Sequence, residues 1–110
     1  ARVLQSGDGN QAFILQRGVE NELALIQYGD DNFYKLINRR SDNNDLVIIQ
    51  NGNDNEIIQR LIDSNNNNVE FIQEGNNNSI IQILEGISGR NYAIRQVGDG
   101  LSVIIRQSSY

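Results

Sequence analysis

The side chains that could do chemistry in this 110-residue chain are carboxylates and amides, because it contains neither His nor Cys. Without these two residue types, the usual pairs of nucleophile and base are missing. Two carboxylates can serve as acid and base in a glycosidase. However, the acidic residues fall in predicted loops or on outward strand positions: Asp30, Asp31, Asp54, Glu56, Glu70 and Glu74. We therefore expect a protein that is not an enzyme and that holds no cofactor.

Calcium binding is a better alternative than catalysis. The acidic, Asn-rich segments 29–32 and 52–55 offer the oxygen ligands that calcium prefers. The calcium-binding nonapeptide pattern is missing, and acidic residues do not recur in every such segment. We expect no metal site, and a calcium-binding surface protein remains an alternative.

The amides recur along the chain with a fixed spacing, which is the sign of a repeat architecture. Three sets of residues follow intervals of 22 or 23 positions. The glutamines are Gln5, Gln27, Gln50, Gln73 and Gln96; the glycines two residues later are Gly7, Gly29, Gly52, Gly75 and Gly98; and the asparagines five residues later are Asn10, Asn32, Asn55 and Asn78. A half-repeat column contains Gln16, Asn38 and Gln107, with Leu61 and Leu84 between them.

Apolar and polar residues alternate between these markers, which predicts short β-strands. The high density of Gly argues against helices. We expect ten strands at about 1–5, 12–16, 23–27, 34–38, 46–50, 57–61, 69–73, 80–84, 92–96 and 103–107. The inward positions are predicted to be Ala1, Val3, Leu23, Leu25, Leu46, Ile48, Val69, Phe71, Tyr92 and Ile94 in one sheet, and Ala12, Ile14, Tyr34, Leu36, Ile57, Gln59, Ile80, Gln82, Val103 and Ile105 in the other.

The segments between strands are predicted to be tight and loose arcs. The Gly column allows positive φ without steric cost, and Asn tolerates the left-handed region. The loose arcs keep Gly18 and Gly86 but have Arg40 and Asp63 at the same place, and they carry one-residue insertions. We expect tight arcs within each turn of a coil and loose arcs between turns.

These features predict an all-β fold, a β-solenoid of five strand–arc–strand rungs with two parallel sheets facing each other. The rungs span about 1–16, 23–38, 46–61, 69–84 and 92–107 of a single domain, residues 1–110. A rung cannot bury its apolar face alone, but stacked rungs can. At about 4.8 Å per rung the body would be roughly 24 Å tall.

Stacking places equivalent side chains in columns. The Gln, Asn and half-repeat amides are therefore predicted to form hydrogen-bonded ladders, as in cross-β assemblies. Gln59 and Gln82 are expected to bond each other. Two apolar columns are predicted on the outside, where they would form hydrophobic surface patches. They are Leu4, Ile26, Ile49 and Ile72, ending in Arg95, and Phe13, Ile58, Ile81 and Ile104, interrupted by Lys35.

Composition limits the possible partners. The net charge of −5 argues against nucleic acid or an anionic membrane as a partner. No apolar run approaches the roughly 20 residues of a membrane helix, so we expect no membrane insertion. The abundance of Asn, Gln and Gly is typical of disordered tracts, but the regular placement of the 38% hydrophobic residues argues against lasting disorder. No signal peptide is visible, and we expect that any leader has been removed.

No cap is predicted at either end, so both terminal rungs would expose strand edges. We therefore expect one molecule to stack on another, end to end, into a cross-β fibril. The main alternative is a capped, monomeric β-solenoid adhesin.

The repeat resembles that of the curlin repeat family, the subunits of bacterial curli fibres, whose pattern is Gln-x-Gly-x-x-Asn-x-Ala-x-x-x-Gln. Gln5, Gly7, Asn10, Ala12 and Gln16 match it in full. The other units keep most of the Gln, Gly and Asn positions. The chain departs from the family where Leu61 and Leu84 replace Gln, and where Asn21, Asn44 and Asn67 stand in place of Ser.

The resemblance implies a structural subunit of an extracellular functional amyloid. Such a chain is exported unfolded through an outer-membrane secretion pore and folds by templating on the cell surface. Its partners would be copies of itself, in a homopolymer, and a nucleator subunit. The resemblance further implies a role in biofilm matrix and adhesion.

Overall fold

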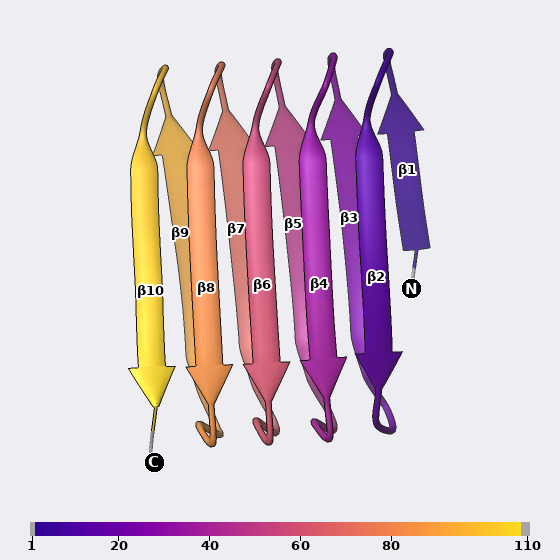
Figure 1. The fold of residues 1–110 in the computed structure, drawn as a ribbon, viewed down its shortest axis with the longest axis vertical. Coiled ribbons are helices and arrows are strands. Elements are labelled where there is room, and N and C mark those ends of the chain that lie inside the picture. The colour runs from indigo at the N-terminus through magenta and orange to yellow at the C-terminus, as the bar shows by residue number, and fades with distance from the viewer. Residues whose placement is uncertain (1, 109–110) are drawn as a thin grey trace.

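A computed structural model describes residues 2–108 apart from the side chain of Tyr92, and it contains ten strands and no helix within that range (Figure 1). The strands are β1 (Arg2–Ser6), β2 (Gln11–Arg17), β3 (Glu22–Tyr28), β4 (Phe33–Arg39), β5 (Asp45–Asn51), β6 (Glu56–Ile62), β7 (Asn68–Glu74), β8 (Ser79–Glu85), β9 (Asn91–Val97) and β10 (Ser102–Ser108). All ten predicted strands are confirmed. From β2 onward each is longer than predicted by one residue at both ends, because the flanking residues also pair, as Gln11 does with Phe33.

The strands form two parallel five-stranded sheets, with the orders β1-β3-β5-β7-β9 and β10-β8-β6-β4-β2. Figure 1 shows the even-numbered strands in front and the odd-numbered strands behind, running in opposite directions. Equivalent residues of successive rungs are in register; Gln27, for example, pairs with Gln5 and with Gln50. The predicted β-solenoid of five rungs is confirmed. The molecule measures 35 × 24 × 17 Å.

The core lies between the two sheets, as the alternating pattern predicts. Leu23, Leu25, Leu46, Ile48, Val69 and Phe71 are buried in one sheet, and Tyr34, Leu36, Ile57, Gln59, Ile80 and Gln82 are buried in the other. Inward residues of the terminal rungs are more open: Val3 is 45% exposed, and Ile14, Ile94 and Ile105 are half-buried. Ala1 and the side chain of Tyr92, both predicted to point inward, lie outside the described residues.

The tight arcs need glycine for two reasons. Gly52 has φ of +126°, and a Cβ atom on it would lie 1.9 Å from the carbonyl oxygen of Gly75 in the next rung. The positive φ was predictable from the sequence, but the close approach of a neighbouring rung was not. In the loose arcs, Arg40 and Asp63 adopt φ of 52° and 51° without glycine.

Candidate functional site

The five-glutamine column forms a continuous row of hydrogen bonds. Each Nε2 from Gln5 to Gln73 donates to the Oε1 of the glutamine in the next rung. The distances are 2.6 Å for Gln5 to Gln27, 2.7 Å for Gln27 to Gln50, 3.0 Å for Gln50 to Gln73 and 2.9 Å for Gln73 to Gln96. The internal amides also donate across the core, as Gln50 does to the carbonyl oxygen of Phe33 at 3.0 Å. The row therefore joins successive rungs and also joins the two sheets.

The asparagine column ties the tight arcs together. Asn32 Nδ2 donates to the Gly52 carbonyl at 2.8 Å, and Asn32 Oδ1 accepts the backbone N–H of Asn55 at 3.1 Å. Asn10, Asn55 and Asn78 make the same contacts with the rungs that follow them. In the last rung Leu101 occupies this column, and its N–H bonds to Asn78 Oδ1 at 3.0 Å. Leu101 has no side-chain polar group with which to continue the column.

The structure adds ladders that the sequence reasoning missed. In the tight arcs, the side chains of Asp30, Asn53, Asn76 and Asp99 each accept a backbone N–H from the preceding rung. In the loose arcs, Asn21, Asn44 and Asn67 form a column, and Ser41 and Ser64 form another. Their residue types recur at the same 22–23-residue interval, and this recurrence was the signal that could have revealed them.

One acidic side chain considered as a calcium ligand is engaged in such a ladder. Asp30 Oδ1 accepts the Asp8 N–H at 2.8 Å, and Asp30 donates its own N–H to Asn53 Oδ1 at 2.9 Å. Within residues 2–108, no three His, Cys, Asp or Glu side chains are grouped so that they could hold a metal ion. In this arc the carboxylate serves as a hydrogen-bond acceptor for the backbone of the preceding rung.

The half-repeat column does not form the predicted ladder. Asn38 is fully buried, and neither its Oδ1 nor its Nδ2 has a hydrogen-bond partner. Gln16 Nε2 and Gln107 Oε1 are likewise unpaired. Two differences explain this. Asn is one methylene shorter than Gln, and Leu61 and Leu84 interrupt the column with apolar side chains.

A short polar row crosses the interior of the second sheet. Gln59 Nε2 donates to Gln82 Oε1 at 2.8 Å, which confirms the predicted bond between them. The Tyr34 hydroxyl donates to Gln59 Oε1, a contact that was not predicted. Burial raises the pKa of Tyr34 well above its ordinary value.

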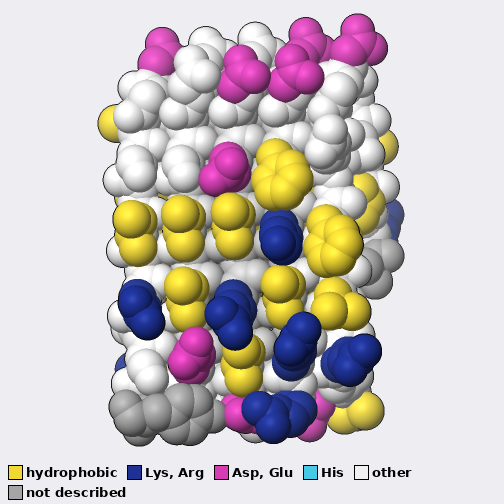
Figure 2. Space-filling view, in the orientation of Figure 1, with side chains coloured by type: hydrophobic (Ala, Val, Ile, Leu, Met, Phe, Trp, Pro, Cys, Tyr) yellow, Lys and Arg dark blue, Asp and Glu magenta, His cyan; other side chains and the backbone are white. Residues whose placement is uncertain are grey.

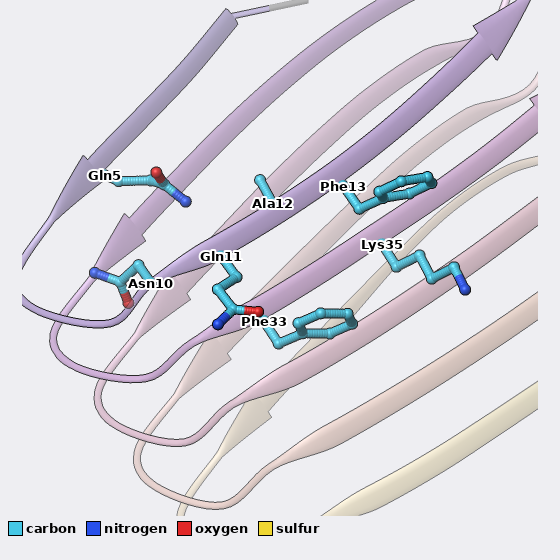
Figure 3. Close-up of a pocket in the computed structure, with 7 residues that line it drawn as sticks. All are labelled: Gln5, Asn10, Gln11, Ala12, Phe13, Phe33 and Lys35. Atoms are coloured by element: carbon cyan, nitrogen blue, oxygen red, sulfur yellow. The ribbon is translucent and has the colours of Figure 1, made fainter.

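The N-terminal end of the stack is hollowed. An open pocket of about 590 Å³ is lined by Gln5, Asn10, Gln11, Ala12, Phe13, Phe33 and Lys35 (Figure 3). Its lining residues come from β1, β2 and β4 and from the first tight arc. Lys35 Nζ lies 5.8 Å from the centroid of the Phe13 ring, within the range of a cation–π contact.

The four strands at the two ends of the stack each pair on one side only within the described chain. They are β1 and β2 at one end and β9 and β10 at the other. A Cβ atom on Gly98, in the last tight arc, would meet only Leu101 Cδ1 at 3.7 Å. The corresponding position on Gly75 is filled by the Gly98 carbonyl, 2.0 Å away. The last rung therefore leaves open a place that a further rung occupies elsewhere in the molecule.

Comparison with known proteins agrees with this repeat geometry. Residues 1–29 match the family model described as the curlin associated repeat. No curated protein matches the chain significantly. The family match confirms the resemblance to the curlin repeat family that the Gln, Gly and Asn spacing predicts, and it covers the first tight arc, the first loose arc and strands β1 to β3.

Proposed function

We propose that this chain is a structural subunit of an extracellular, curli-like amyloid fibre that grows by stacking rung on rung. The fibre would support biofilm matrix and adhesion, with a nucleator subunit and an outer-membrane secretion pore as partners. The curlin repeat match supports the family role. The geometry of the two ends supports the mode of growth.

The observation that carries the proposal is the unfilled position next to Gly98. In every other tight arc, the carbonyl of the next glycine lies about 2 Å from the place a Cβ atom would take. Gly7 heads the same column in the first rung and presents the same type of arc. The first rung of a second copy would therefore fit the last rung of this one.

The direction of the side-chain hydrogen bonds makes the two ends complementary. Within the subunit the row begins with Gln5 Nε2 as a donor and ends with Gln96 Oε1 as an acceptor. In a stacked copy, Gln96 Nε2, which also donates to the Ser79 carbonyl, would meet Gln5 Oε1 of the next subunit. In the arc column, backbone N–H groups donate to the side chain of the following rung, so the Asp99 N–H would meet Asp8 of the next copy. Two identical ends would place donor against donor, and we therefore expect head-to-tail stacking.

The test is a substitution at Gly98. Gly98→Ala puts a methyl group where the backbone of the next subunit would sit, without a clash inside its own subunit. Seeded growth, followed by thioflavin fluorescence, should stop when this variant adds to wild-type seeds, because its last rung cannot be covered. Unfolding measurements should show that the isolated variant remains folded, although the φ of +127° adds some backbone strain.

Gly100→Asn is the matched control. It adds a larger side chain to the same arc, at the position that Asn77 occupies with φ of 59° in the preceding rung. This variant should elongate like the wild type. Fibre diffraction of the wild type should show a meridional reflection at about 4.7–4.8 Å. A wild-type protein that stays monomeric, without that reflection, would contradict the proposal and favour the monomeric adhesin.

A further inference from the structure

The two outer faces of the solenoid carry matching apolar columns. We call the outward side chains of β2, β4, β6, β8 and β10 the even face, and those of the other strands the odd face. On each face, one apolar column lies at the position three residues away from the tight arcs. It contains Phe13, Ile58, Ile81 and Ile104 on the even face, and Leu4, Ile26, Ile49 and Ile72 on the odd face. Figure 2 shows the even face, where this column forms a row of hydrophobic side chains interrupted by one cation. Contiguous apolar surface of this kind marks an interaction site.

The two faces carry opposite charge at the same end of the solenoid. Near the loose arcs, Arg17 and Arg39 are neighbours on the even face. At the same end, Glu22 and Asp45 are neighbours on the odd face. Among the described residues, the even face has an excess of positive charge and the odd face an excess of negative charge. The even face has the cations Arg17, Lys35, Arg39, Arg60 and Arg106 and the anions Glu56 and Glu85. The odd face has the anions Glu22, Asp45, Glu70 and Glu74 and the cations Arg2 and Arg95.

Three arginines of the even face form no ion pair with a carboxylate among the described residues. The ion pairs found in residues 2–108 are Arg40 with Asp63 and Arg95 with Glu74, so Arg17, Arg39 and Arg60 have none. These three line, with Arg40 and Ile62, an open hollow of about 460 Å³. Figure 2 shows the cations of this face gathered below the hydrophobic row. Neighbouring like charges without counter-ions repel one another, and an acidic surface would relieve that repulsion.

We propose that a second copy of this chain covers the even face with its odd face. Even and odd strands run in opposite directions, so their loose-arc ends lie at the same edge of the molecule (Figure 1). A copy shifted along the short axis, without rotation, brings the two apolar columns together. The same shift sets Arg17 and Arg39 opposite Glu22 and Asp45, and Arg60 opposite Glu70.

Pairing of two even faces is less favourable. A two-fold axis along the strands, through the middle rung, would set Arg60 against Arg60 of the second copy and would offer Arg39 one carboxylate, Glu85. A two-fold axis along the stack would set Arg17 and Arg39 against the column that begins with Gln11 and Phe33, which offers one carboxylate, Glu56. The even-to-odd contact is heterologous and does not close, so it joins molecules into open lateral arrays.

The size of the contact makes this pairing depend on stacking, and the inference therefore rests on the proposed function. Five strands about 4.8 Å apart and seven residues long give a face of roughly 550 Å². Stable interfaces bury about 800 Å² per partner. A single pair of subunits would bind weakly, whereas two stacked filaments would add many such contacts along their length.

Disulfide cross-linking tests the contact, because the chain has no cysteine of its own. Ile58→Cys and Ile72→Cys place single thiols in the apolar columns of the even and odd faces, at positions that the same shift sets opposite each other. Equal amounts of the two variants are mixed, assembled and oxidised, and the dimers are separated by electrophoresis and identified by mass. We expect the mixed 58–72 disulfide to dominate. A random share of mixed and like dimers, or no dimer in material that shows the 4.7–4.8 Å reflection, overturns the inference.

Charge exchange gives a second measurement. Arg17→Glu with Arg39→Glu should reduce the mixed disulfide to its random share, while stacking, followed by thioflavin and diffraction, continues. Adding Glu22→Arg and Asp45→Arg to the same chain should restore the mixed product. If charge reversal leaves cross-linking unchanged, the carboxylates of a second copy are not what the arginines bind.

These readouts separate the two proposals. Loss of the diffraction signal in the wild type refutes end-to-end stacking. In that case the cross-link pattern of concentrated, unstacked protein still decides the lateral contact. An even face that serves an unrelated polyanion would give the random share of dimers, and this also counts against lateral pairing.

Discussion

Asn38 lies beside Gln16 in neighbouring parallel strands, yet no hydrogen bond joins the two amides. Asn38 is fully buried between Gln16 and Leu61 of the same column. Elsewhere in the solenoid, stacked amides satisfy one another, so this pair is an exception. An unsatisfied buried amide costs about 1–3 kcal/mol.

Replacing Asn38 should therefore stabilise the fold. Asn38→Leu would extend the apolar column of Leu61 and Leu84 by one residue, and it removes the unpaired polar atoms. We expect the free energy of unfolding to rise by about 1–3 kcal/mol, measured by denaturant titration. The same exchange at Asn32, whose amide is fully bonded, should destabilise the protein. A loss of stability in Asn38→Leu would show that this amide has a partner in solution.

The glutamine row predicts a charge effect on assembly. Gln50→Glu with Gln73→Glu places two carboxylates next to each other in the core, where the amides now bond at 3.0 Å. Buried like charges without partners are strongly unfavourable, so elongation should slow at neutral pH. Protonation of the carboxyl groups should restore part of the rate in acid. Elongation rates equal to those of the wild type at neutral pH would contradict the inward position of this row.

Burial of Tyr34 predicts a loss of stability in alkali. Its pKa is held well above the ordinary value, so the unfolded chain ionises first as the pH rises. The stability that the neutral hydroxyl contributes to the fold is fully present below about pH 10. It is lost as the pH rises from there through the pKa of the folded state.

The pH dependence of unfolding measures this effect. Tyr34→Phe should remove most of the alkaline decline, although it also gives up the bond to Gln59 and is less stable at neutral pH. Tyr28→Phe, at an exposed position, should keep the decline. An alkaline decline of equal steepness in Tyr34→Phe and in the wild type would assign it to other groups.

Leu101 predicts a weak point between stacked subunits. It stands at the end of the asparagine column and offers no amide to the backbone of a following rung. Leu101→Asn would restore one donor and one acceptor, each contributing about 1 kcal/mol. We expect slower dissociation of fibre ends, measured by dilution. Leu101→Ser, with a side chain too short to reach both groups, is the comparison, and equal dissociation of all three proteins would show that the column plays no part in the joint.

Much of the fold was predictable because each rung repeats the same few requirements. The alternation around Leu46 and Ile48 gave the strands, and the spacing of Gln27, Gln50 and Gln73 gave the register. Periodicity does not reveal how closely backbones approach, so the carbonyl beside Gly52 could not be foreseen. The predicted ladder in the half-repeat column was wrong because the prediction considered residue type without side-chain length. Side-chain length decides whether Asn38 reaches a neighbour.

The parallel pairing of each strand with the one 22 or 23 residues away has a consequence for how such chains can change. Removing or duplicating one whole repeat changes the surroundings of the flanking repeats only, because no contact between the described strands skips a rung. Length is then not fixed by the architecture, and duplication or deletion of repeats within the gene can lengthen or shorten the protein without a new core.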